Sequence, residues 1–252
     1  MKTTLPFLLD HFPNGNIEGG IHINIAGWAG SFRSGLMYDI IQDLVRNNPN
    51  LAQESKSIVV ADAENSVETM AKFVTRKRHP TEEDAKVLRD AGLNLISLNV
   101  YDVTAWKHIV KEFSQNDNKI SVLAIDGIWN GHALIGDGKE RALKVLTLYE
   151  SLEELTKWCQ ENKVLLITTL EIHKYMPDMD KIKRAFTYDD YLDSIAAGYY
   201  KGGNMLTNLM DISLFTYVHR EVEPMTLSVL SIDRKRHRQV IMSTRMPIRL
   251  PE

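Results

Sequence analysis

The stretch INIAGWAGSFRSGLMYDII, residues 23–41, decides the fold that the sequence predicts. It begins as a short apolar run, passes through glycines and other small residues, and continues with the apolar spacing of an amphipathic helix. Residues 27–34 read G-W-A-G-S-F-R-S, which is close to the phosphate-loop signature G-x-x-x-x-G-K-[ST]. Phe32 replaces the second glycine and Arg33 replaces the lysine. We therefore predict a strand, a phosphate-binding turn and a helix, with two departures from the motif.

A phosphate loop binds anions because backbone N–H groups and the partial positive charge of a helix N-terminus converge on one point. A cation then neutralises the outer phosphates, and a hydroxyl group reaches Mg²⁺. Arg33 supplies the cation and Ser34 the hydroxyl group, although the planar fork of arginine is bulkier than lysine and differently directed. Trp28 is able to stack on a base, to shield the loop or to pack on a neighbour. The candidate nucleotide-binding residues are Gly27, Trp28, Ala29, Gly30, Ser31, Phe32, Arg33, Ser34 and Gly35.

The bulk composition excludes several classes of protein. Of 252 residues, 44% are hydrophobic and 25% are charged, as is typical of globular proteins, and a net charge of −3 does not indicate nucleic-acid binding by the whole chain. No apolar run approaches the roughly 18 residues needed to span a bilayer, so we expect no membrane partner. The single Cys159 has no partner for an internal disulfide and is expected to be a packing residue. A reducing compartment follows, namely the cytoplasm, or the host cytoplasm if the protein is viral.

Apolar runs rich in β-branched residues alternate with amphipathic stretches along most of the chain. The expected strands are 22–27, 57–63, 94–100, 120–126 and 163–171, and the expected helices are 34–47, 66–74, 103–115 and 149–162. Nearly continuous apolar strands separated by helices are typical of a parallel sheet that is buried on both faces. Three more strand-like runs, at 210–218, 225–233 and 238–244, follow without intervening helices.

These patterns predict an α/β fold in a single domain, residues 1–252. A mostly parallel central sheet is flanked by helices and continues into an antiparallel C-terminal extension. Residues 1–20 form an N-terminal arm, and residues 234–252 form a basic C-terminal segment.

Acidic residues follow three of the expected strands. The second strand ends in Asp62-Ala63-Glu64, the fourth ends in Asp126, and the fifth ends in Glu171. In an open parallel sheet, ligands bind beyond the carboxyl ends of the strands, so these acids are expected beside the loop. Acids often cap strands, but as a set beside a phosphate-loop candidate they point to metal-assisted phosphoryl transfer.

Together, these motifs resemble those of the RecA-type ATPases, especially the shortened recombinases of large tailed phages. GGIHINIAGWAGSFRSG resembles their phosphate loop, and IVVADAEN is similar to the strand that ends in Asp-Ala-Glu-His. ISVLAIDGI resembles the Walker B strand, and KVLLITTLEIH resembles the strand that ends in a nucleotide-sensing glutamine. KGGNMLTNLMDISLFTYVHR is similar to the stretch after the second DNA loop. The resemblance spans roughly residues 15–245.

The resemblance implies a RecA-like P-loop NTPase core with ATP and Mg²⁺ as cofactors. Glu64 takes the place of the glutamate that activates water, and Asp126, with Ser34, takes the metal side. Arg33 stands at the lysine position and Glu171 at the glutamine position. A carboxylate near a γ-phosphate repels it unless the carboxylate is paired or protonated. Either departure implies slow hydrolysis, or nucleotide binding without turnover.

The resemblance also implies two loops that face DNA, residues 129–141 and residues 174–201. The basic candidates are Lys139, Arg141, Lys174, Lys181, Lys183, Arg184 and Lys201. The second loop carries five Lys or Arg and five Asp, so its formal charge is zero. If it binds DNA, its charges must be segregated, or partner protomers must supply the rest.

A basic cluster follows the strand-like run 225–233. From residue 234 to the end there are six Arg or Lys and one Glu, a formal charge of +5, which suggests a local polyanion contact or a solvated edge. Arg234 and Arg236 have the spacing that places two side chains on one face of a strand. The resemblance implies that they reach the γ-phosphate held by a neighbouring subunit, and a solvated hairpin is the alternative interpretation.

The expected function is therefore that of a RecA-like recombinase, a DNA-dependent ATPase that self-associates on single-stranded DNA into a filament or ring. One alternative is the motor of a DnaB-type hexameric helicase, because MDISLFTYVHREVE followed by VLSIDRKRH is similar to the last strands of that family, with its Lys-x-Arg finger. A second alternative is a mediator or assembly subunit that keeps the fold without hydrolysing ATP, which the altered loop at Arg33 favours.

Overall fold

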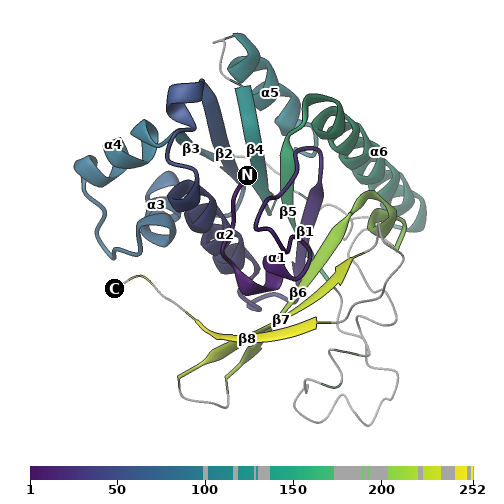
Figure 1. Cartoon of the computed structure of the whole chain (residues 1–252). Coiled ribbons are helices and arrows are strands. Elements are labelled where there is room, and N and C mark those ends of the chain that lie inside the picture. The colour runs from purple at the N-terminus through teal and green to yellow at the C-terminus, as the bar shows by residue number, and fades with distance from the viewer. Residues whose placement is uncertain are drawn as a thin grey trace.

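A central sheet of eight strands organises the computed structural model, in the order β3-β2-β4-β5-β1-β6-β7-β8 (Figure 1). The structure describes residues 1–98, 102–115, 119–127, 129, 137–172, 189, 192, 204–220, 224–233, 242–248 and 251. The strands are β1 (His22–Gly27), β2 (Lys56–Asp62), β3 (Leu93–Ser97), β4 (Lys119–Asp126), β5 (Leu165–Glu171), β6 (Ile212–His219), β7 (Thr226–Asp233) and β8 (Met242–Pro247). This arrangement confirms a mostly parallel α/β sheet with antiparallel strands at its C-terminal side.

Strand β6 differs from the prediction, which placed it in the antiparallel extension. It pairs parallel with β1, so that Ile23 lies opposite Ile212 and Gly27 opposite Thr216. Among the strands that the structure describes, the β6–β7 and β7–β8 pairs are the antiparallel ones. The first five residues of β6 are buried, as expected for an inner strand beside β1. The absence of a preceding helical pattern was therefore the wrong criterion for the direction of this strand.

Helices cover both faces of the sheet (Figure 1). They are α1 (Pro6–Leu9), α2 (Arg33–Asn47), α3 (Val67–Thr75), α4 (Glu82–Asp90), α5 (Ala105–Gln115) and α6 (Gly138–Asn162), with short 3-10 turns at Ala52–Glu54 and Asn204–Leu209. One apolar core gathers α1, α2 and α3 on one face, and a second gathers α5 and α6 on the other. Ile58 and Val60 face the first core, whereas Val59 and Ala61 face the second. This alternation explains why the strands read as continuous apolar runs.

Two helices differ from their predicted extents for local reasons. Helix α4 was not predicted, because residues 82–90 are short and mostly charged, and none of them is buried. A capping box stabilises the start of this helix. The Thr81 hydroxyl group accepts from the Asp84 N–H, and the Asp84 side chain accepts from the Thr81 N–H. Helix α6 begins eleven residues before its predicted start at 149. Cys159 is buried in the second core, as predicted for a packing residue. Burial raises the pKa of its thiol.

The first residues of the chain pack on the domain. Phe7, Leu8 and Ile17 are buried in the first core. The Thr3 hydroxyl group donates to Asp43 on α2 at 2.6 Å, and the Met1 amino group donates to the Ile17 carbonyl oxygen at 2.8 Å. Residues 1–17 therefore contribute to the same core as the strands.

A buried histidine makes the folded state sensitive to acid. His22, the first residue of β1, donates its Nδ1–H to the Leu209 carbonyl oxygen at 2.8 Å, and its Nε2 atom lies 2.8 Å from the Thr168 hydroxyl oxygen. Burial lowers its pKa from 6.5 to about 4, against the opposing effects of Leu209 and the Asp211 charge. Below pH 6.5 the unfolded chain binds the proton more readily, so the stability present above pH 6.5 is lost as pH falls towards 4.

We expect the free energy of unfolding to drop by about 3 kcal/mol between pH 6.5 and pH 4 because of this one group. Urea unfolding of the wild type and of His22→Gln across this range tests the expectation. The glutamine variant removes the titration, so its stability should fall less steeply; equal slopes in the two proteins would contradict the assignment.

Candidate nucleotide-binding edge

The predicted nucleotide-binding loop and the predicted acidic residues lie at the carboxyl edge of the parallel sheet. In the register of the sheet, Asp62 lies opposite Asp126, and Gly27 lies opposite both Glu171 and Thr216. The loop that follows β1 therefore stands beside the ends of β5 and β6, with the ends of β4 and β2 next in the sheet. This is the arrangement in which α/β proteins bind ligands.

The loop between β1 and α2 is held by its own turn and by β6. The Ser31 N–H donates to the Trp28 carbonyl oxygen at 3.1 Å, and the Ser31 and Thr216 hydroxyl groups are 2.9 Å apart. A Cβ atom on Gly27 would lie 2.1 Å from Ser31 Oγ and 2.5 Å from Thr216 Oγ1. The close approach of these hydroxyl groups thus requires glycine at the end of β1.

We expect Gly27→Ala to lower the free energy of unfolding by about 1–3 kcal/mol, because the added methyl group overpacks the loop. Gly138→Ala is the matched control, since a Cβ atom at Gly138 meets nothing within 4 Å and lies at the start of α6. The control should be neutral or slightly stabilising, as alanine is the better helix former. Thermal and denaturant unfolding measure both, and equal stability of Gly27→Ala and wild type would show that the loop is looser than described.

Phe32, at the position of the second glycine of the phosphate-loop motif, has a backbone conformation that favours glycine. Its φ of 67° and ψ of 28° lie in the left-handed region, which costs a non-glycine residue roughly 1–2 kcal/mol. The Phe32 ring lies over Gly35, where a Cβ atom would be 2.3 Å from a ring carbon. Gly35 therefore makes room for the ring. The chain therefore places a bulky aromatic residue in a left-handed turn just before α2.

Arg33 and Ser34 open helix α2, where the partial positive charge of the helix N-terminus also lies. Arg33 is only 9% exposed. The Ser34 hydroxyl group hydrogen-bonds to the carboxyl group of Asp126. The loop and the end of β4 thus lie close together at Ser34 and Asp126.

Asp126 is a buried acid with an unusual protonation equilibrium. Its pKa is raised from 3.8 to about 7, first by burial and then by the charges of Asp62 and Glu64, while the Ser34 and Thr169 hydroxyl groups oppose the rise. Thr169 donates to Oδ1. Among the residues that the structure describes, Oδ2 has no partner in hydrogen-bonding geometry. A buried carboxylate oxygen without a donor is a site that a cation would stabilise.

Asp62 has the opposite environment. The Tyr38 hydroxyl group and the Asn65 side-chain amide donate to Oδ2, and the backbone N–H groups of Glu64 and Asn65 donate to Oδ1 at 2.7 and 2.8 Å. The carboxylate is fully used by the protein, so it fixes the turn that carries Glu64. Tyr38 and Asn65 were not predicted as site residues. The position of Asn65 was a usable signal, because an Asp side chain often accepts from the backbone N–H groups that follow it, as Asp62 does here.

Glu64 is exposed and lies against the residue that follows Asp126. A Cβ atom on Gly127, which has φ +74°, would be 2.6 Å from Glu64 Cγ. Glycine at position 127 therefore lets Glu64 reach the end of β4. At the end of β5, Glu171 lies opposite Gly27, and the Ile172 N–H donates to the Gly27 carbonyl oxygen at 3.0 Å.

The donor set fits a magnesium ion that arrives with a nucleotide. The described residues contain no group of three or more His, Cys, Asp or Glu side chains suited to a metal. Ser34 and Asp126 offer one hydroxyl group and one carboxylate. Mg²⁺ typically takes one or two protein ligands and completes its shell with phosphate oxygens and water.

The remaining predicted residues contribute less. Lys139 is exposed in the first turn of α6, and Arg141 lies in the same helix, with its side chain outside the described part. Residues Lys174, Lys181, Lys183, Arg184, Lys201, Arg234 and Arg236 lie outside the described residues. Their DNA-binding and trans-acting roles therefore stay predictions from the sequence.

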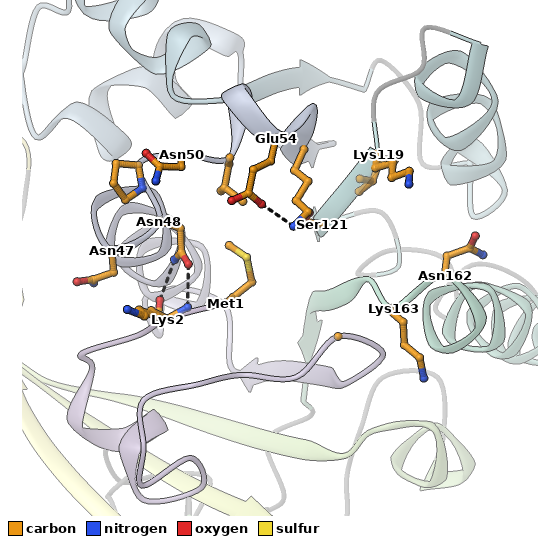
Figure 2. A pocket seen from close by; sticks show the side chains of 15 residues that line it. Met1, Lys2, Asn47, Asn48, Asn50, Glu54, Lys119, Ser121, Asn162 and Lys163 are labelled. Atoms are coloured by element: carbon orange, nitrogen blue, oxygen red, sulfur yellow. Dashed lines mark hydrogen bonds and ion pairs between the residues drawn. The ribbon is translucent and has the colours of Figure 1, made fainter.

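A cavity of about 730 Å³ lies at the amino-terminal ends of the strands, opposite the carboxyl edge (Figure 2). Lys56 and Lys119, the first residues of β2 and β4, line it together with the C-terminal ends of α2 and α6. Asn48 and Lys2 bond to each other on its wall, and Lys56 pairs with Glu54 at 2.6 Å (Figure 2). None of the predicted site residues lines this cavity.

None of the helices in the described part of the chain has the length and apolar character needed to cross a bilayer. No protein-family model matches the chain, and no curated protein matches it either. The case for a function therefore depends on the chemistry of the carboxyl edge.

Proposed function

We propose that this chain is a RecA-type P-loop ATPase that self-associates on single-stranded DNA and acts in homologous recombination or repair, in the cytoplasm or, if viral, in the host cytoplasm. The observation that carries the proposal is the contact between Ser34 of the loop and the buried Asp126 of β4, with Glu64 beside it. A phosphate-binding loop, a metal-side acid and a candidate base are thus neighbours. The RecA-like resemblance of the sequence supplies the more specific class.

The residues at the carboxyl edge have distinct roles in this proposal. The backbone of residues 28–32 and the N-terminus of α2 bind the triphosphate, and Arg33 adds a cation. Ser34 and Asp126 hold Mg²⁺, which supplies charge neutralisation for the phosphoryl group when bound. Glu64 accepts a proton from the attacking water and orients it, while Asp62 keeps the Glu64 turn in place.

Glu171 sets an expectation about rate. It lies opposite Gly27, where the family resemblance places a glutamine. An ionised carboxylate beside the outer phosphate opposes charge accumulation there. We expect slow turnover in the absence of DNA. The two predicted DNA-facing loops and the pair Arg234 and Arg236 support DNA binding and self-association on sequence grounds alone.

A titration tests the proposal directly. ATP is added to the full chain with Mg²⁺, with and without a single-stranded oligonucleotide, and binding and ADP release are both measured. We expect saturable binding in the micromolar to millimolar range that is typical of enzymes, and turnover that rises with DNA. Absence of ATP binding at millimolar concentrations would overturn the proposal.

Two alternatives remain as outcomes of related measurements. The substitution of the motif lysine by a largely buried Arg33 favours a mediator or assembly subunit, which would bind ATP without turnover even with DNA. Strands β6 and β7, which pair as neighbours, carry the sequence that is similar to DnaB-type helicases. Closed rings in micrographs and strand unwinding would favour that motor, whereas open filaments and strand pairing favour the recombinase.

A further inference from the structure

Arg220 reaches from the end of β6 to the phosphate-loop candidate. Its Nη2 atom donates to the Gly30 carbonyl oxygen at 3.2 Å, and the side chain is otherwise exposed. Gly30 has a φ of +76°, which favours glycine, and a Cβ atom there would lie 3.1 Å from Nη2. Glycine at this position thus permits the turn and leaves room for the guanidinium group.

The position of Arg220 is set by the pairing of β6 with β1. These strands run parallel, with Gly27 opposite Thr216, and the Thr216 hydroxyl group contacts Ser31 at 2.9 Å. Strand β6 and the residue after it therefore contact the loop at two points. Thr216 contacts Ser31, and Arg220 contacts Gly30. Figure 1 shows the two strands side by side at the centre of the sheet.

The phosphate-loop candidate has an arginine where the motif has its lysine. Arg33 replaces the motif lysine and is 9% exposed at the first turn of α2. Arginine and lysine differ in direction and shape, so a substituted arginine does not reproduce the reach of the lysine ammonium group. Arg220 is exposed and carries five N–H donors in a planar fork that suits phosphate oxygens. One of these donors accounts for the Gly30 contact.

We propose that Arg220 is a second phosphate-binding cation of the site, contributed by the same chain. It keeps its bond to the Gly30 carbonyl oxygen and donates further N–H groups to the outer phosphates of a nucleoside triphosphate. This inference rests on the proposed nucleotide binding and adds to it a residue and a preference: affinity should rise with the number of phosphates. It is distinct from the predicted trans roles of Arg234 and Arg236, because no neighbouring subunit is needed.

Two variants, the wild type and three nucleotides test the role of Arg220. Dissociation constants for Mg²⁺ with ATP, ADP or AMP are measured by calorimetry for wild type, Arg220→Ala and Arg220→Lys. Loss of a charge-assisted hydrogen bond should weaken ATP binding by on the order of tenfold or more, ADP binding less, and AMP binding hardly at all. Arg220→Lys keeps the charge without the fork, so it should fall between alanine and wild type.

Arg245→Ala is the matched control. Arg245 is another exposed arginine that bonds to a neutral oxygen, with its Nε donating to the Thr226 hydroxyl group at 2.9 Å across the β7–β8 pair. Its replacement should leave all three affinities unchanged. Thermal unfolding without nucleotide checks that Arg220→Ala folds. If it does not fold, the affinities of Arg220→Lys decide the question.

The outcomes separate this inference from the proposed function. If wild type binds ATP and both Arg220 variants bind it equally well, the role of Arg220 is wrong and nucleotide binding stands. A loss of the same size for ATP and AMP would assign Arg220 to loop structure and also overturn the inference. If wild type binds no nucleotide, both proposals fall together.

Discussion

A Glu64→Gln protein is expected to bind Mg²⁺ and ATP as the wild type does and to lose ATP turnover by about 100-fold or more. Glutamine keeps the size of the side chain and its position against Gly127, but it accepts no proton from water. General-base catalysis contributes roughly 100- to 10,000-fold to such reactions, so this is the largest effect on rate that we expect. Steady-state ADP release and equilibrium ATP binding, both measured with single-stranded DNA present, give the two quantities.

Glu68→Gln is the control for this prediction. Glu68 lies in the first turn of α3 and pairs with Lys72 at 2.8 Å on the surface. An exposed pair of this kind contributes little to stability, and the substitution should change neither binding nor turnover. Normal turnover in Glu64→Gln would remove Glu64 from the proposed mechanism, and a joint loss of binding and turnover would point to a structural role.

Asp126→Asn is expected to stabilise the protein without nucleotide and to remove its response to Mg²⁺ and ATP. The folded-state pKa of Asp126 is about 7, compared with an unfolded value of 3.8. Stability associated with the protonated acid is full below pH 3.8 and is lost as pH rises through 7. Above pH 7 the ionised, buried carboxylate destabilises the fold, so asparagine should raise the free energy of unfolding by roughly 2–4 kcal/mol.

The same substitution removes the anionic ligand of the proposed metal. Wild type should gain thermal stability on addition of Mg²⁺ and ATP, because ligands that bind only the folded state stabilise it, and Asp126→Asn should gain little. Unfolding curves at pH 4, 6 and 8 measure the first effect, and thermal shifts with and without the nucleotide measure the second. Destabilisation of Asp126→Asn at every pH would contradict the environment described for this acid.

Asp62→Asn offers a contrast at the neighbouring strand. Asp62 accepts from Tyr38, Glu64 and Asn65, so an amide group there would direct N–H donors at other donors. A carboxylate that accepts several bonds is costly to remove. We therefore expect this variant to lose stability at neutral pH. If Asp126→Asn raises the free energy of unfolding and Asp62→Asn lowers it, the two results would separate the binding residue from the structural one.

The sequence predicted the parts of this fold that depend on local pattern. Nearly continuous apolar runs located β1 to β5, because each strand carries residues for both cores, as Val59 and Val60 do. Acids at strand ends located Asp126 and Glu64, since parallel strands end at one edge. Helix α4 escaped prediction because it buries no residue and depends on the Thr81 cap.

Contacts between distant segments could not be predicted in the same way. The role of Thr216 beside the loop depends on β6 pairing with β1, and no local pattern in either strand specifies that partner. Arg220 follows from the same pairing. The left-handed backbone of Phe32 was also hidden, because the residue type gives no sign of it. The pKa of Asp126 arises from burial and from Asp62, which only the assembled sheet brings together.

The place of β1 in the sheet has a consequence for synthesis on the ribosome. Both partners of β1 are made late, since β5 begins at Leu165 and β6 at Ile212. The segment that carries the loop must therefore wait until β5 and then β6 have been made before its two edges are covered. Pairing across such long separations slows folding and leaves apolar strand surface open to aggregation. Chains that stop before residue 212 should thus need chaperone protection, and the nucleotide itself should bind only after β6 has emerged.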